Sequence, residues 1–285
     1  MLGGLARATA PAAALTVTDM LGRPVTLAGA PRRMVSLVPS VTELLFALEA
    51  GDRLVGRTDF CDFPPAARRI PSVGGMVAPS LEAIVARGPD LVVATDAGNR
   101  HETVARLVQI GIPVYLVHVH RLAEVWELAG RLAGLTGRPA AAPALVAGLQ
   151  ARVRRVEEAV RARPRPRVLY VLWPEPLIVP GREALVTELI GLAGGRSVTA
   201  GEPGDYPRFS LEAAVARAPE VIVLARHGSG SGPIPRDPWD RLASLPAVRD
   251  GRIHPVDGDL LHRYGPRVVD GLERLARVLH PEVFR

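Results

Sequence analysis

Ser80–Pro89, with the sequence SLEAIVARGP, recurs 130 residues later as Ser210–Pro219, SLEAAVARAP, and eight of the ten positions are identical. Each copy runs on into an apolar segment, LVVA after the first and VIVL after the second. A short helix that begins with Ser and Glu and leads into a buried strand is therefore predicted twice. The repeat indicates two similar α/β lobes, each with one glutamate, Glu82 or Glu212, in the same place.

Length and composition agree with this prediction. The chain has 285 residues, about twice the usual domain size, so two lobes are the natural expectation. Aromatic residues make up 4% of the chain, whereas Ala, Val and Leu bring the hydrophobic fraction to 48%, as in a globular α/β protein. No apolar run reaches the ~18 residues of a membrane-spanning helix.

The net charge of +6 comes from a basic set that contains Arg and no Lys. Arginine-rich runs at 152–155 and 161–167 could indicate a nucleic-acid surface, but they interleave with Glu157 and Glu158 on a predicted helix. This pattern is typical of a solvated helix face, so no nucleic-acid partner is expected. The single cysteine, Cys61, rules out an internal disulfide.

Residues 1–14 resemble the end of an export signal, with one Arg, many Ala and the stretch APAAA. Their apolar stretch is shorter than that of a complete signal. We therefore expect an exported protein and assign residues 1–14 to a signal remnant or a disordered end.

The remaining chain is predicted to form two α/β lobes with mainly parallel sheets, joined by one long helix. The first lobe, 15–137, contains a Ser-x-x-Glu capping box at Ser40–Glu43 that would open a helix. The helix at 138–164 has apolar residues at spacings of three and four and is stiffer than a Gly/Ser linker. The second lobe is 165–285. The expected elements are a hairpin at 16–18 and 25–27, strands at 34–38, 91–95, 113–117, 168–172, 221–224 and 252–256, helices at 44–49, 101–110, 121–135, 183–192 and 266–279, and a Gly/Ser/Pro loop at 228–235.

Ligands of open α/β lobes bind outside the carboxyl ends of the strands, so the loops there should face a cleft between the lobes. Motifs for catalysis are missing, since the sequence has no Gly-x-Ser-x-Gly elbow, no Walker loop and no Gly-x-Gly-x-x-Gly at the first strand–helix turn. Cys61 and the seven histidines show no spacing that supports a Cys/His pair. We therefore expect a binding protein rather than an enzyme.

Aromatic side chains of this aromatic-poor chain occur in the predicted loops. Phe60 and Phe63 flank Cys61, Trp173 follows a strand, and Tyr206 precedes a proline. Some of these rings could form a satellite core beneath a turn. Together they would give a pocket of apolar faces with few charges, which suits a large flat ligand better than a sugar or a bare ion.

The histidines support a metal hypothesis as well. His118 and His120 project to one side of an extended segment, and with His262 or Asp259 they could complete a zinc or iron site. The alternative is that both imidazoles lie in solvent at a strand end, because no third potential ligand occurs at a sequence spacing typical of metal sites.

The repeated glutamates also have two interpretations. A carboxylate near the amino end of a helix gains ~0.3–1 kcal/mol from the helix dipole, which could explain Glu82 and Glu212 singly. Both lobes keep the whole Ser-Leu-Glu-Ala motif. The alternative is therefore that the two glutamates are presented together to a partner with two-fold symmetry.

The chain resembles the periplasmic binding proteins whose lobes are joined by one long helix, a class that serves cobalamin, haem and ferric-siderophore importers. The resemblance covers nearly all of the chain and includes a segment most similar to the cobalamin-binding branch. The segments that carry it are Thr18–Arg23, Pro31–Leu37, the two Ser-Leu-Glu repeats, Asp96–Asn99, and Gly56–Pro65 followed by Val73–Gly75. The resemblance implies an importer subunit that captures cobalamin or a related corrinoid in the interlobe cleft.

The resemblance also implies roles for individual residues. Phe60 and Tyr206 stand where that branch has rings against the corrin, and Asp259 stands where an acidic residue meets the ligand's amides. Met76 stands where an aromatic is found in the best-known member, which leaves haem, bound by Tyr264 or His262, or a ferric siderophore as alternative ligands. The residues expected to bind the ligand are Phe60, Cys61, Met76, Asn99, Trp173, Tyr206, Asp259, His262 and Tyr264.

Glu82 and Glu212 match the glutamates that, in this class, dock into arginine pockets on the two permease subunits. The resemblance thus implies a periplasmic, monomeric protein that delivers its ligand to an ABC permease dimer. No resident cofactor is expected.

Overall fold

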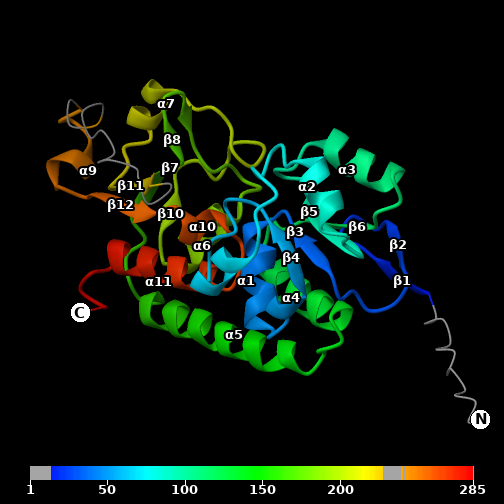
Figure 1. The fold of residues 1–285 in the computed structure, drawn as a ribbon. Helices are drawn as coiled ribbons and strands as arrows, with labels where there is room; N and C mark the ends of the chain where they lie inside the picture. Colours follow the sequence, from blue (N-terminus) through cyan, green and yellow to red (C-terminus); the bar gives the residue numbers. More distant parts are fainter. Residues whose placement is uncertain (1–13, 227–238, 240–241, 285) are drawn as a thin grey trace, which may run out of the picture. The chain divides into compact units, whose positions relative to one another are not determined.

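The computed structural model describes residues 14–226, 239 and 242–284, and its contacts divide the chain into two units (Figure 1). The first unit holds residues 1–118 and 131–139, and the second holds residues 119–130 and 140–285. Nearly all of the predicted signal remnant and all of the loop predicted at 228–235 lie outside the described residues. In the part of the chain that is described, no helix is both long and apolar enough to cross a membrane.

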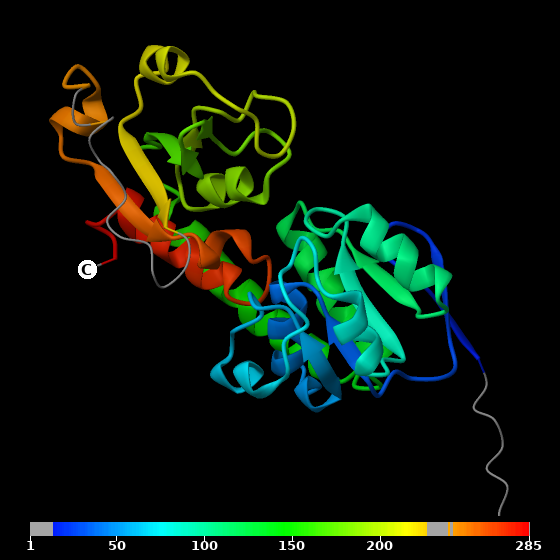
Figure 2. The same cartoon turned by 45° about the horizontal axis from the view of Figure 1, so that its top comes forward.

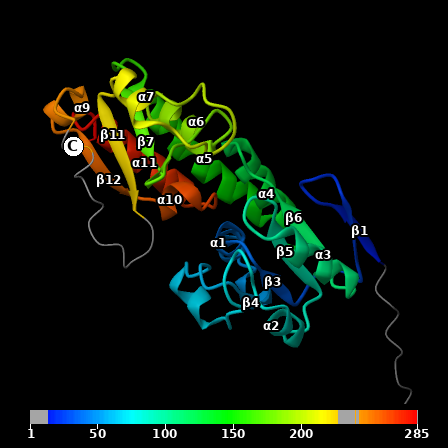
Figure 3. The same cartoon turned by 90° about the horizontal axis from the view of Figure 1, so that it is seen from above.

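The first unit alternates strands and helices around one parallel sheet. Its elements are β1 Leu15–Thr18, β2 Pro24–Leu27, β3 Met34–Ser36, α1 Pro39–Ala47, η1 Gly51–Arg53, β4 Leu54–Arg57, η2 Pro65–Arg69, α2 Leu81–Ala86, β5 Leu91–Thr95, α3 His101–Gln109 and β6 Val114–Val117. The sheet order is β4-β3-β5-β6. The predicted hairpin is confirmed as antiparallel β1–β2, and Met20 N–H donates to the Leu116 carbonyl of β6 at 3.1 Å, which anchors the hairpin at this edge (Figure 3).

The second unit is built on another parallel sheet, of order β10-β7-β11-β12. Helices α5 and α11 lie side by side in this unit (Figures 1 and 2). A short antiparallel pair, β8 with β9, follows the first strand of the sheet. The elements are α5 Ala141–Val160, β7 Arg167–Val171, β8 Trp173–Pro174, β9 Leu177–Ile178, α6 Leu185–Leu192, β10 Arg196–Ser197, α7 Leu211–Ala216, β11 Val221–Arg226, α9 Pro246–Arg249, β12 Ile253–Asp257, α10 Asp259–His262 and α11 Val268–Leu279.

Both four-stranded sheets have the same strand order, in which the first strand of the sheet lies between its second and third strands. The repeated helices α2 and α7 each lead into the third strand, β5 or β11. Both helices are capped as predicted, because the Ser80 and Ser210 hydroxyls accept the N–H of Ala83 and Ala213 at 3.1 and 3.0 Å. The prediction of two similar α/β units is therefore confirmed.

An arginine at the start of the first strand of each sheet, Arg33 just before β3 and Arg167 as the first residue of β7, makes the same contacts with the end of the repeat. Arg33 donates from Nε to the Gly88 carbonyl, and Arg167 does so to the Ala218 carbonyl, both at 2.9 Å. The acidic residue after the repeated proline accepts the backbone N–H of the same arginine, at 3.0 Å for Asp90 and 2.8 Å for Glu220. Charge-assisted bonds of this kind tie the third strand to the first in both units.

The two central strands of the second sheet, β7 and β11, are buried on both faces, as their continuous apolar runs predict. Along β7, Val168 and Tyr170 pack on the face covered by α5, α6 and α11. Leu169 and Val171 pack on the opposite face, with Ala214 of α7 and other apolar side chains. Loops that carry polar and aromatic residues follow the carboxyl ends of these strands.

The helix predicted at 138–164 is present as α5, with a slightly shorter range. Its apolar side chains Leu149, Val153 and Val156 pack into the core of the second unit. The helix α4, Leu122–Leu135, contributes Leu122 and Val125 to that same core, so residues 119–130 group with the second unit instead of the first lobe as predicted. The bridging role of α5 stays a prediction.

The capping box predicted at Ser40–Glu43 is wrong. Helix α1 begins at Pro39, with Val38 as the N-cap and no capping side chain. Proline is well suited to the first helical position because its φ is fixed and it needs no hydrogen-bond partner for an N–H. The helix therefore starts before Ser40, and both Ser40 and Glu43 are buried inside it.

Candidate functional site

The residues predicted to bind a ligand lie in loops after strand carboxyl ends or beside them, on both units. In the first unit, the loop after β4 carries Phe60, whose side chain is 54% exposed. The neighbouring Cys61 is 1% exposed, and its sulfur lies 3.2 Å from the Thr58 hydroxyl and 3.8 Å from the Ser36 carbonyl. Burial raises the pKa of the Cys61 thiol. This geometry favours a packing role for Cys61, although its role in ligand binding stays a prediction.

Met76 and Asn99 come together in the first unit. The buried Asn99 side chain accepts the Thr95 N–H at 2.8 Å and donates to the Met76 carbonyl at 2.7 Å. A Cβ on Gly98 would lie 2.5 Å from Met76 Cε, so the methionine side chain packs directly against this glycine. Asn99 thus holds the loop that presents Met76 against the turn after β5.

In the second unit, the fold gathers three tyrosines around one histidine. His262 Nε2 lies 2.8 Å from the Tyr170 hydroxyl, and His262 Nδ1 lies 3.2 Å from the Tyr206 hydroxyl. The Tyr206 and Tyr264 hydroxyls are 2.5 Å apart. The rings of Tyr170 and Tyr206 also contact the imidazole, with centroid separations of 5.6 and 5.7 Å. We call these four residues the tyrosine–histidine cluster.

The three phenols of the cluster are uncharged at physiological pH. Burial raises the pKa of Tyr264 to about 12 and raises the pKa of Tyr206 and of Tyr170 well above the ordinary value of 10.0. The carboxylate of Asp205 adds to the increase for Tyr206 and Tyr264. The phenols are therefore available as hydrogen-bond donors and acceptors rather than as phenolates.

Other polar and aromatic side chains of the second unit belong to the same set of loops. His120 Nδ1 lies 2.9 Å from the carboxylate of Asp205, the residue before Tyr206. Asp259 forms an ion pair with Arg263 at 2.8 Å. Trp173 is 52% exposed and donates from its indole N–H to the Glu175 carbonyl at 3.0 Å, which fixes the orientation of the ring.

The structure does not favour a metal site built on His118 and His120. The two imidazoles have different carboxylate partners, Asp96 at 2.7 Å for His118 in the first unit and Asp205 for His120 in the second. Within residues 14–226, 239 and 242–284, no group of three or more His, Cys, Asp or Glu side chains could hold a metal ion.

The repeated glutamates are both exposed in the first turns of α2 and α7. Glu82 accepts a hydrogen bond from the Ser80 hydroxyl at 3.1 Å. Each side chain therefore stands at the amino end of a short helix, as the repeat predicts, and remains accessible to a partner.

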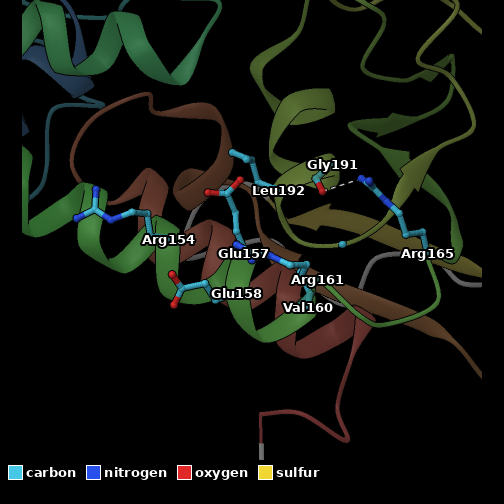
Figure 4. Close-up of a pocket in the computed structure, with 9 residues that line it drawn as sticks. Arg154, Glu157, Glu158, Val160, Arg161, Arg165, Gly191 and Leu192 are labelled. Carbon is cyan, nitrogen blue, oxygen red and sulfur yellow. Dashed lines mark hydrogen bonds between the residues drawn. The ribbon is translucent and has the colours of Figure 1, made fainter.

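A pocket of about 340 Å³ lies elsewhere in the second unit, between the last turns of α5 and the end of α6 (Figure 4). The residues that line the pocket include three arginines and two glutamates, so positive and negative charges nearly balance. Arg165, one of these arginines, donates a hydrogen bond to the Gly191 carbonyl at 2.9 Å. The predicted ligand-binding residues are not among the residues that line it. A pocket of this composition is a poor match for a large apolar ring.

Sequence reasoning missed three residues of the second unit. Tyr170 lies in an apolar strand, so the pattern gives burial without showing that its hydroxyl meets His262. Asp205 stands next to Tyr206, and a search for acids beside candidate aromatics would have found it. Arg263 lies four residues after Asp259, and this spacing on a helix is a signal for an ion pair.

Comparison with known proteins identifies the family to which this chain belongs. A family model described as periplasmic binding protein matches residues 34–260. The vitamin B12-binding protein of Vibrio cholerae is 28% identical over 247 residues, which cover 87% of this chain and 88% of that protein. An uncharacterised ABC transporter substrate-binding lipoprotein of Bacillus subtilis is 27% identical over 278 residues, 95% of this chain and 87% of that protein.

Solved structures show the same fold. A crystal structure of the periplasmic vitamin B12 binding protein of Vibrio cholerae has a TM-score of 0.78 at 26% identity, and the match covers 88% of this chain and 98% of that one. A periplasmic haem binding protein from Pseudomonas aeruginosa has a TM-score of 0.79 at 29% identity, with 89% of this chain and 94% of that one covered.

Proposed function

Because the chain belongs to the periplasmic binding protein family, we propose that it is the substrate-binding component of an ABC importer and that its ligand is cobalamin or a related corrinoid. The Vibrio cholerae relative named for vitamin B12 supports the ligand, and the Bacillus subtilis relative supports the transport role. Binding rather than catalysis is the proposed activity, in an exported protein.

The observation that carries the ligand proposal is that the second unit holds both the tyrosine–histidine cluster and the exposed ring of Trp173. A corrinoid has a large flat ring whose edge carries neutral amides. Exposed aromatic faces suit the ring, and neutral hydroxyls suit the amides, because neither requires a charged ligand group. The exposed Phe60 and the loop-held Met76 of the first unit offer further apolar surface.

Haem is the second candidate, since the Pseudomonas aeruginosa relative is named as a haem binding protein and the cluster holds both Tyr and His. Ferric iron prefers a phenolate over a phenol. Burial and Asp205 both hold Tyr264 in its neutral form, and this disfavours it as an iron ligand. The corrinoid is therefore the proposal that the surroundings of Tyr264 support better.

We assign delivery of the ligand to the exposed glutamates. Glu82 and Glu212 occupy equivalent places on two units of the same topology, so they would suit two equivalent basic pockets on a permease dimer. An acidic side chain that becomes buried against an arginine on docking gives a strong, oriented contact.

Calorimetric titration of the purified protein with cyanocobalamin tests the ligand proposal. One-to-one binding is expected, and Phe60→Ala or Tyr206→Ala should weaken it about tenfold or more because each removes an aromatic face. Val108→Ala is a matched control, since Val108 is also an exposed apolar side chain but lies near the end of α3 and is not a predicted site residue. A tight titration with haemin and no heat with any corrinoid would move the proposal to haem.

A further inference from the structure

The tyrosine–histidine cluster is a single chain of hydrogen bonds, in the order Tyr170, His262, Tyr206, Tyr264. Its three contacts are 2.8, 3.2 and 2.5 Å long. All four residues belong to the second unit. The direction in which protons are donated along such a chain follows from the number of protons and from the burial of its ends.

Four polar hydrogens are available for the three contacts. Each of the three tyrosines supplies one O–H, and a neutral imidazole supplies one N–H. Each contact uses one hydrogen, so one is left over. That hydrogen must lie at one end of the chain or on the hydroxyl next to that end.

The Tyr170 end cannot easily hold the extra hydrogen. Tyr170 is 0% exposed, and among the described residues its hydroxyl has one hydrogen-bond partner, His262 Nε2. If Nε2 carried the hydrogen, the Tyr170 O–H would be buried without an acceptor, which is costly. Tyr170 therefore donates to Nε2, and His262 carries its hydrogen on Nδ1 and donates it to Tyr206.

The extra hydrogen is then at the Tyr206–Tyr264 end. Tyr206 already has two neighbours, whereas Tyr264 has Tyr206 alone among the described residues. Both residues are half-buried, whereas Tyr170 at the other end of the chain is fully buried. Donation from Tyr206 to Tyr264 leaves the Tyr264 O–H pointing away from the cluster.

We infer that Tyr264 is a specificity-determining residue, whose hydroxyl donates a hydrogen bond to an oxygen acceptor of the bound ligand, and that Tyr170 and His262 are positioning residues that set this direction. The inference rests on the proposed function and adds a requirement on the ligand. It must present an uncharged carbonyl or a similar oxygen to Tyr264, as the side-chain amides of a corrinoid do. The raised pKa of Tyr264 supports donation, because the hydroxyl keeps its proton.

The first test reads the proton directly and needs no ligand. In a nitrogen-15 NMR spectrum of the histidine-labelled protein at neutral pH, the signals of His262, assigned by their loss in His262→Gln, should show the tautomer with the hydrogen on Nδ1. Tyr170→Phe, which keeps the ring but removes the donor, should shift His262 toward the other tautomer. An Nε2–H tautomer or an imidazolium in the wild type overturns the inference.

The second test measures cyanocobalamin affinity. Tyr264→Phe keeps the aromatic ring and should weaken binding about three- to tenfold, the effect of one neutral hydrogen bond. Tyr115→Phe is the control, because it makes the same change on a buried tyrosine of the first unit and should leave affinity unchanged.

The outcomes separate the two proposals. If the wild type binds no corrinoid, the proposed ligand is wrong while the NMR result still tests the direction of the chain. If the wild type binds and Tyr264→Phe binds equally well, the role of Tyr264 is wrong. If Tyr264→Phe instead abolishes haemin binding together with a ferric-phenolate absorption band, Tyr264 is an iron ligand and the donor role is overturned.

Discussion

Gly88 and Ala218 occupy the same position of the internal repeat, and both have a positive φ, 53° and 43°. The left-handed conformation is open to glycine but strains a residue with a Cβ. Ala218→Gly should therefore raise the free energy of unfolding by about 0.5–1 kcal/mol, and Gly88→Ala should lower it by a similar amount. Urea denaturation of each variant measures the change.

A control separates this local strain from a general effect of glycine. Ala147 is exposed in the middle of α5, where glycine is unfavourable, so Ala147→Gly should lower the free energy of unfolding by about 1 kcal/mol. If Ala218→Gly destabilised the protein as much as Ala147→Gly does, the strain at Ala218 would be disproved.

Arg152 links α5 to α11 through Glu273, with two contacts of 2.9 Å, and through Asp270 at 2.5 Å. Arg152→Met should lower the free energy of unfolding by about 1 kcal/mol at pH 7, because the bidentate pair is partly buried. Arg152 lowers the pKa of Glu273 from its ordinary value of 4.5. The pair therefore stabilises the fold fully above that pH, and the stabilisation is lost as the pH falls through the folded pKa.

Denaturation curves of the wild type and Arg152→Met between pH 7 and pH 3 test this linkage. The gap between the two proteins should narrow as the pH falls. A gap that stays constant would show that Arg152 acts through packing of its side-chain methylenes alone.

The Cys61 thiol should be unreactive in the folded protein, because it is buried and burial raises its pKa. A thiol reagent such as dithionitrobenzoate should modify Cys61 only after denaturant is added. Prior incubation with cyanocobalamin should leave the native rate unchanged. Rapid stoichiometric reaction of the native protein would show that the loop after β4 opens readily and that Cys61 is accessible to small molecules.

The paired glutamates should matter for transport and not for ligand affinity. The double variant Glu82→Ala with Glu212→Ala should bind cyanocobalamin in solution with near wild-type affinity. It should stop uptake in vesicles that contain the cognate permease, because removing one partner of a charge pair buried at the docked interface costs about 2–5 kcal/mol of docking free energy. Glu102→Ala is the matched control, because Glu102 is also exposed in the first turn of a helix. Normal uptake by the double variant would show that the two glutamates have no role in docking and only stabilise the amino ends of their helices.

The strands and the two-unit organisation could be predicted because buried apolar runs and the repeated phrase are local signals. The start of α1 could not, because Ser40 and Glu43 match a capping box while Pro39 already begins the helix. The two-residue strands β8, β9 and β10 are too short to give a periodic pattern. Their pairing depends on backbone contacts with distant segments.

The candidate site was partly predictable for a related reason. Tyr206, His262 and Tyr264 stand out as polar aromatic residues in or next to loops, but their hydrogen bonds join positions 56 and 58 residues apart. Tyr170 completes the chain from inside a strand, where sequence shows only that the position is buried. Such a network depends on tertiary packing, which no local pattern encodes.

A direct competition between the two candidate ligands tests the central claim. The purified protein is incubated with equimolar cyanocobalamin and haemin, each in excess, and the protein fraction is separated by gel filtration and examined by absorption spectroscopy. The proposed function predicts a corrinoid spectrum at one ligand per protein, with little haem retained. A haem spectrum with no bound corrinoid would contradict it.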